Sequence, residues 1–130
     1  MRSEAARANR QGIVDMIAMH GLERCDTCRK ARAWLDQRGV PYRFNDYRDQ
    51  PVEDRGLLAY ARQLGWDRLV NRGGRTWRDL PESARAPQSD TDWLDLVRAH
   101  PTFIRRPLLV FPDGSAAVGF SASRYASLFP

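Results

Sequence analysis

The chain has 130 residues, a length that fits one domain with a true hydrophobic core. Hydrophobic residues make up 42% and charged residues 28%, values typical of a globular protein, and every apolar run is far too short to cross a membrane. The net charge of +5 comes almost entirely from arginines that are scattered along the chain, so we expect no direct nucleic-acid binding.

The beginning of the chain differs from the rest in composition. Residues 1–11 are polar and rich in alanine and arginine, without the apolar core of a signal peptide. We expect residues 1–15 to be a disordered extension, with Met16 as an alternative start, and residues 16–130 to form the folded domain. A cytoplasmic protein is expected, and in that compartment a cysteine pair is more often catalytic or redox-sensing than structural.

The chain has two cysteines, Cys25 and Cys28, at C-x-x-C spacing. This spacing lets both sulfurs face one side of a helix's first turn, close enough to form a disulfide after little movement. Residues 16–21 predict a short buried strand before the pair, and residues 28–38 have apolar positions at helical spacing. A C-x-x-C between a strand and a helix is typical of a thioredoxin-like redox site, so redox chemistry is the first hypothesis.

The segments after this helix continue an α/β pattern. Gly39 ends the helix, and the alternation over residues 42–47 predicts a half-buried strand parallel to the first. Residues 52–64 carry leucines on one helical face and predict a helix closed by Gly65. Residues 69–77 contain two glycines and are expected to be irregular.

The last third of the chain predicts a helix over residues 91–100 and a β-hairpin. Its strands are expected at 108–111 and 116–118, joined by a turn at Pro112-Asp113-Gly114. Ser121 then caps a final helix through Leu128. The order predicts an α/β, thioredoxin-like fold, in which a four-stranded mixed sheet is built from βαβ, a β-hairpin and a final helix, with a helical insertion between the halves.

Three separated segments resemble the arsenate reductase (ArsC) and Spx family. Residues 25–35, followed by Val40-Pro41-Tyr42, are similar to the first helix and second strand of that family. Residues 69–72 lie where the family carries an arginine, and residues 100–108 resemble its passage from His-Pro to Arg-Pro and a strand. The resemblance covers about residues 16–128, and the chain looks closest to the YffB-like reductases of the family.

The resemblance implies roles for particular residues. Cys25 matches the family's nucleophile, and the N–H groups and dipole of a following helix favour a thiolate there. Arg72 and Arg106 match two arginines that hold an oxyanion beside the nucleophile, which suits the planar donor fork of a guanidinium. Pro107 resembles the family's cis-proline facing the active-site cysteine.

The role of Cys28 stays open among three alternatives. It resolves a mixed disulfide, it closes a regulatory disulfide with Cys25 as in Spx proteins, or it packs as a small residue against the sheet. Gly119 stands where dedicated arsenate reductases carry a third arginine, which weakens the case for arsenate as substrate. The resemblance therefore points to a thiol reductase that uses glutathione, whose carboxylates Arg72 and Arg106 clamp.

Two functions from different classes follow. The first is a thiol reductase in which Cys25 attacks an oxidised substrate, a small thiol compound or an oxyanion. It has no bound cofactor, uses glutathione as reductant and acts as a monomer without a membrane partner. The second is an Spx-like regulator that binds RNA polymerase and uses a Cys25–Cys28 disulfide as a switch. We expect no metal site, because His20 and His100 lack the paired spacing of zinc ligands.

Overall fold

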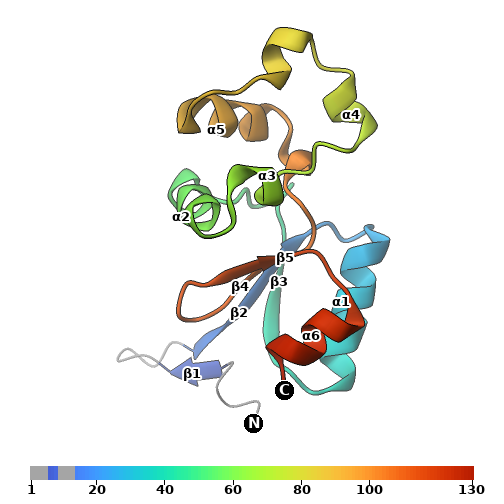
Figure 1. Ribbon diagram of the computed structural model, residues 1–130. Coiled ribbons are helices and arrows are strands. Elements are labelled where there is room, and N and C mark those ends of the chain that lie inside the picture. The colour runs from blue at the N-terminus through green and yellow to red at the C-terminus, as the bar shows by residue number, and fades with distance from the viewer. Residues whose placement is uncertain (1–5, 9–13) are drawn as a thin grey trace. The chain divides into compact units, whose positions relative to one another are not determined.

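The computed structural model describes residues 6–8 and 14–130 and is shown in Figure 1. The chain divides into two compact units. The first combines Met1–Gln50 with Arg106–Pro130, and the second comprises Pro51–Arg105. Within the described residues, none of the helices has both the length and the apolar character that crossing a membrane requires.

The sheet of the first unit is built around β2 (Val14–Gly21). This strand pairs in parallel with β3 (Tyr42–Asp46) and antiparallel with β4 (Leu108–Val110), which in turn pairs antiparallel with β5 (Ala116–Val118). The result is a mixed four-stranded sheet in the order β3-β2-β4-β5. The predicted thioredoxin-like α/β arrangement is confirmed, with the βαβ half and the hairpin half joined through β2 and β4.

A further strand, β1 (Ala6–Ala8), pairs antiparallel with the beginning of β2. The sequence predicts a disordered extension over residues 1–15. In the structure, Ala6–Ala8 instead form a strand, and residues 14–15 belong to β2. The remainder of that extension, residues 1–5 and 9–13, lies outside the described residues. Strand pairing uses backbone N–H and C=O groups whatever the side chains are, so a polar composition carries no signal for it.

Helices α1 (Asp26–Gln37) and α6 (Ala122–Leu128) cover one face of the sheet (Figure 1). The rings of Trp34 and Tyr125 meet edge-to-face at 5.6 Å, which places α6 against α1. As predicted, Ser121 caps α6, and its hydroxyl accepts a hydrogen bond of 3.2 Å from the N–H of Arg124. The buried members of this core are Ile17, Met19, Ala31, Trp34, Leu35, Leu109, Ala117 and Tyr125.

The second unit is the predicted helical insertion. It contains α2 (Asp54–Leu64), α3 (Trp66–Leu69), α4 (Arg75–Arg78) and α5 (Asp90–Ala99), with 3-10 turns at Glu82–Arg85 and Pro101–Phe103. The segment expected to be irregular, residues 69–77, includes the end of α3 and most of α4. A four-residue helix is too short to show an apolar period, so the sequence pattern missed both helices.

Aromatic rings form much of the interior of the second unit. Trp93 is stacked between Trp66 and Trp77, with ring centroids 5.6 Å and 6.0 Å away. Trp77 meets the edge of Phe103, and Phe103 stacks on His100. Trp77 and Trp93 are thus buried core residues of this unit, and Trp66 is half-buried at the end of the stack.

Candidate active site

Cys25 lies at the start of α1, directly after the loop that leaves β2. Its backbone is extended (φ −86°, ψ 123°), and its carbonyl oxygen accepts a helical hydrogen bond of 2.9 Å from the N–H of Arg29. The side chain is partly exposed and the thiol is free. Cys25 therefore presents a sulfur that solvent can reach at the positive end of a twelve-residue helix.

The surroundings of Cys25 lower the pKa of its thiol. Partial burial raises the pKa, but the backbone N–H of Cys28, the thiol of Cys28 and the guanidinium of Arg106 together outweigh that effect by favouring the charged form. The thiolate is the reactive species of a cysteine. The geometry thus supports the role predicted for Cys25 as a nucleophile.

Cys28 is in a different environment three residues later. Its side chain is fully buried, and a Cβ built on Gly21 would lie only 2.5 Å from its sulfur, so the thiol packs against bare backbone of β2. Burial is the main cause that raises the pKa of Cys28 to about 11, and the nearby sulfur of Cys25 adds to it. Cys28 therefore stays a protonated thiol that favours the Cys25 thiolate by hydrogen bonding.

Arg106 and Pro107 enter the site from the segment before β4. The Nη1 of Arg106 donates a hydrogen bond of 3.3 Å to the hydroxyl of Tyr47, and its guanidinium also interacts with Cys25. The Arg106–Pro107 peptide bond is cis, and Pro107 is fully buried. Of the residues predicted from the sequence, the first unit thus holds Cys25, Cys28, Arg106 and Pro107.

The carboxyl end of β3 supplies site residues that the sequence analysis missed. Tyr47 is fully buried, and its N–H donates to the carbonyl of Gly21 at 3.1 Å. Asn45 lies within hydrogen-bond distance (2.9 Å) of Nδ1 of His20 and donates to the carbonyl of Gln50. One signal was available: parallel strands end at the same edge of a sheet, so residues after the predicted second strand had to lie near the C-x-x-C loop.

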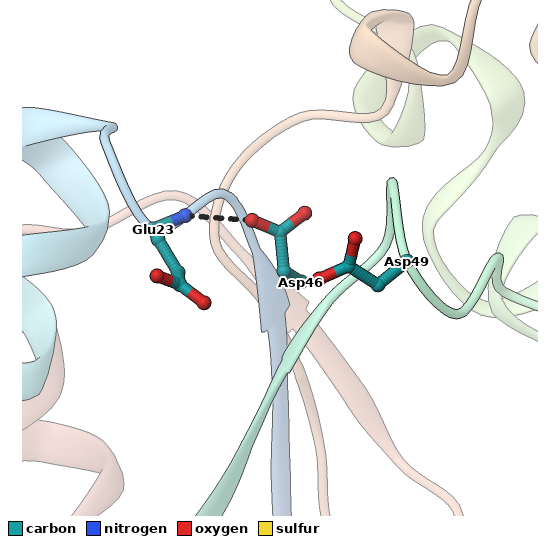
Figure 2. A group of neighbouring side chains, drawn as sticks. All are labelled: Glu23, Asp46 and Asp49. Carbon is teal, nitrogen blue, oxygen red and sulfur yellow. Dashed lines mark hydrogen bonds between the residues drawn. The ribbon is translucent and has the colours of Figure 1, made fainter.

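Asp46 connects the end of β3 to the loop that carries Cys25 (Figure 2). Its Oδ2 accepts hydrogen bonds of 3.1 Å from the N–H of Glu23 and from Nη2 of Arg48, while its Oδ1 accepts from the N–H of Arg48 at 3.0 Å. The bond with the Arg48 side chain is the main cause that lowers the pKa of Asp46 to about 2. Asp46 is thus a charged anchor for the loop two residues before Cys25.

Figure 2 also shows Asp49 beside this anchor. One carboxylate oxygen from each of Glu23, Asp46 and Asp49 lies within 4.8 Å of the others, a spacing that a metal ion can bridge. Both oxygens of Asp46 already accept hydrogen bonds from N–H donors, however. The hydrogen bonds of Asp46 are therefore explained by anchoring the loop, without a metal ion.

Arg72 belongs to the second unit, in the segment after α3. Its guanidinium forms a salt bridge of 3.1 Å with Asp67, and both side chains are exposed. Val70, two residues before Arg72, pairs with Ile104 in an isolated antiparallel bridge. The structure therefore gives Arg72 a partner within its own unit, and its role as a clamp for an anionic substrate stays a prediction.

Each histidine that the sequence analysis singled out has a structural partner. His20 contacts Asn45, and burial, helped by the charge of Arg43, lowers its pKa to about 4, so the ring is neutral near pH 7. His100 belongs to the second unit, where its ring stacks on Phe103 at a centroid distance of 4.7 Å. His20 is thus held by a hydrogen bond, and His100 by ring stacking.

Comparisons with known proteins agree on one family. The ArsC family model matches residues 20–128. An uncharacterized protein of Haemophilus influenzae is 35% identical over 114 residues, which cover 88% of this chain and 99% of that protein. The global transcriptional regulator Spx of Enterococcus faecalis is 24% identical over 118 residues, covering 88% of this chain and 87% of the regulator.

Solved structures lead to the same family. A protein named YFFB has a TM-score of 0.79 at 35% identity, with 86% of this chain and 97% of that chain covered. An arsenate reductase (ArsC) related protein from Brucella melitensis has a TM-score of 0.70 at 34% identity, with 87% and 93% covered. The family match spans both units and includes every residue that the sequence predicts for the site.

Proposed function

Because the chain belongs to the ArsC family, we propose that it is a thiol-dependent reductase in which Cys25 supplies the nucleophilic thiolate. The observation that carries this proposal is the environment of Cys25. Its partly exposed sulfur lies at a helix N-terminus beside Arg106, and its pKa is lowered. A thiol with these surroundings reacts near neutral pH, when an ordinary cysteine of pKa about 8.5 is only about 3% thiolate.

We propose glutathione as the reductant. The Cys25 thiolate attacks the glutathione sulfur of a mixed disulfide, an S–S bond forms between Cys25 and glutathione, and the substrate leaves as a thiolate that takes a proton from water. A second glutathione thiolate then attacks the adduct, which releases oxidised glutathione and restores Cys25. In this scheme the second glutathione rather than Cys28 resolves the adduct, because the side chain of Cys28 is fully buried.

In the proposed reaction, Arg106 and Arg72 bind and orient the carboxylates of glutathione. Gly119, where dedicated arsenate reductases carry an arginine, has φ +81°, and its N–H donates to the carbonyl of Pro107 at 3.0 Å. Side chains rarely adopt this left-handed conformation, so the backbone here favours glycine. The position therefore offers no arginine side chain to an oxyanion, which weakens the case for arsenate as the substrate.

The proposal is tested by alkylating wild type, Cys25→Ser and Cys28→Ser across pH, followed by turnover with a glutathione mixed disulfide. We expect wild type to react with an apparent pKa below that of an ordinary cysteine and to cycle through a glutathione adduct on Cys25. Cys25→Ser should fall to background, while Cys28→Ser should retain turnover, because the backbone N–H of position 28 is unchanged and a serine hydroxyl also donates a hydrogen bond. A wild-type protein without turnover, or turnover that survives in Cys25→Ser, would contradict the proposal.

Replacement of Arg106 tests the anion site. Arg106→Lys should raise the KM for glutathione roughly tenfold, since a point charge replaces a bidentate fork and a charge-assisted hydrogen bond contributes about 1.5–3 kcal/mol. Arg105→Lys is the matched control, because the Nε of Arg105 donates instead to the carbonyl of Arg68 in the second unit. Equal KM values for wild type and Arg106→Lys would remove Arg106 from the site.

A second candidate is the Spx-like regulator, favoured by the intact pair of free thiols Cys25 and Cys28 and by the Spx relatives. In that case oxidation closes an intramolecular disulfide rapidly, without catalytic turnover, and the two redox forms bind RNA polymerase differently. Mass spectrometry of the oxidised protein and pull-down of RNA polymerase distinguish this function from the reductase. Size-exclusion chromatography tests the monomer that we propose for either function.

A further inference from the structure

We infer that Tyr47 is a positioning residue for the proposed reaction, because its phenol holds the Arg106 guanidinium beside Cys25. The inference deepens the proposed function and rests on it in one respect, namely that Cys25 acts as a thiolate. It assigns to Tyr47 no contact with substrate. The residue acts through Arg106.

Tyr47 is itself fixed at two points. It follows β3 directly, its N–H donates to the carbonyl of Gly21 at 3.1 Å, and its ring is fully buried. At the other end its hydroxyl accepts the hydrogen bond of 3.3 Å from Nη1 of Arg106. An arginine side chain has many rotamers, and a hydrogen bond to a rigid buried partner restricts them. Tyr47 therefore limits the positions that the guanidinium can take near Cys25.

The phenol of Tyr47 is also uncharged. Burial raises the pKa of Tyr47 to about 12, and the nearby sulfurs of Cys28 and Cys25 act in the same direction, so the phenol carries no charge at neutral pH. A carboxylate in this place would cancel the charge of Arg106 and repel the thiolate. A phenol orients the guanidinium and leaves its positive charge to act on Cys25.

The groups whose charge or hydrogen bonding reaches this site come from three elements. Cys25 caps α1 and Cys28 lies in its first turn, Tyr47 follows β3, and Arg106 precedes β4. Arg106 is the one cation among them. Displacing its guanidinium from Cys25 should therefore be visible in the ionisation of that thiol.

The primary experiment measures the pH profile of Cys25 alkylation by iodoacetamide in wild type and Tyr47→Phe, with labelling of Cys25 quantified by peptide mass spectrometry. We expect Tyr47→Phe to react about threefold to tenfold more slowly at pH 6 and equally fast on the high-pH plateau, which corresponds to an upward pKa shift of about 0.5 to 1. The matched control is Tyr42→Phe, because the hydroxyl of Tyr42 interacts with Arg32 and Asp36 instead. Superimposable profiles of Tyr47→Phe and wild type would overturn the inference.

A double-mutant cycle tests whether Tyr47 acts through Arg106. Tyr47→Phe should slow alkylation in the wild-type background and have little further effect in Arg106→Lys, because the partner that it positions is already altered. Equal effects of Tyr47→Phe in both backgrounds would show that Tyr47 acts independently of Arg106 and would contradict the inference.

A spectroscopic measurement covers the case in which Tyr47→Phe does not fold. In protein labelled with ¹³C at the tyrosine ζ carbon, Arg106→Lys should shift the Tyr47 signal and leave those of Tyr42 and Tyr60 in place. An unchanged Tyr47 signal would overturn the inference. Turnover with a glutathione mixed disulfide is a separate arm: its absence in wild type would contradict the reductase, whereas the alkylation profiles decide the role of Tyr47.

Discussion

At the scale of single residues, Gly21 sets the space in which Cys28 lies. The Cβ of any other residue at position 21 would come within 2.5 Å of the Cys28 sulfur, a distance that side chains do not tolerate. The close approach keeps Cys28 buried and its pKa high, while Cys25 faces solvent with a lowered pKa. Gly21, whose φ is not positive, is thus needed for packing, because it leaves room for the buried sulfur of Cys28.

Gly21→Ala should therefore reduce the free energy of unfolding by about 1–3 kcal/mol, the usual cost of overpacking a core, as measured by urea denaturation. The same substitution should cost less in a Cys28→Ala background, which removes the sulfur that the new methyl group meets. An equal loss in both backgrounds would mean that the contact between position 21 and Cys28 does not limit stability.

At the scale of elements, the carboxyl ends of the parallel strands β2 and β3 build the site together. β2 leads into the loop and α1 that carry Cys25, and β3 leads into Asp46 and Tyr47. Asp46 binds the N–H of Glu23 in the loop, and Tyr47 binds both Gly21 and Arg106. The position of Cys25 relative to Arg106 is therefore set by hydrogen bonds from the end of a neighbouring strand.

Asp46→Asn tests this anchor through its pH dependence. Because the pKa of Asp46 is about 2 in the folded protein and near 3.9 in an unfolded chain, its carboxylate stabilises the fold above pH 3.9, and this contribution is lost as the pH falls toward 2. At pH 7 the variant should lose about 1–3 kcal/mol in urea denaturation, and the difference from wild type should shrink between about pH 4 and pH 2.

Asp49→Asn is the matched control for this experiment. Asp49 lies in the same acidic cluster but is exposed, so its replacement should change stability by less than about 0.5 kcal/mol. A difference between wild type and Asp46→Asn that stays constant down to pH 2 would contradict the anchor.

At the scale of the whole molecule, the chain forms two compact units. The first unit joins one sheet face to α1 and α6, and its one tryptophan, Trp34, packs on Tyr125. The second unit has three tryptophans, of which Trp93 lies between the rings of Trp66 and Trp77. The proposed nucleophile and Arg106 belong to the first unit and Arg72 to the second.

Trp93→Ala should remove the middle ring of this stack and lower the free energy of unfolding by about 3–5 kcal/mol, because a large buried side chain is replaced by a cavity. Denaturation followed by far-ultraviolet circular dichroism measures the loss. Arg62→Ala, at an exposed position of α2, is the control and should change stability by less than about 0.5 kcal/mol. Equal stability of Trp93→Ala and wild type would contradict the core role of the stack.

Much of the fold was predictable because its signals are local. The apolar run before Cys25, the alternation after Pro41, the Asp113-Gly114 turn and the Ser121 cap each depend on residues close in sequence, and the structure has the elements that they predict. The misses share another cause. Strand β1 forms through backbone pairing with a partner strand, and α3 and α4 are too short for a periodic pattern.

The sequence by itself determined the α/β thioredoxin-like order of elements, the family, and Cys25 at the start of a helix, because periodicity, turn chemistry and C-x-x-C spacing are written along the chain. Only the tertiary structure decided how the two cysteines differ and which groups surround them. Burial against Gly21 raises the pKa of Cys28. Arg106 approaches Cys25 from a segment about 80 residues away, and its guanidinium is hydrogen-bonded to Tyr47. Acidity depends on solvent exclusion and on charges nearby in space, and both arise when distant segments meet in the folded chain.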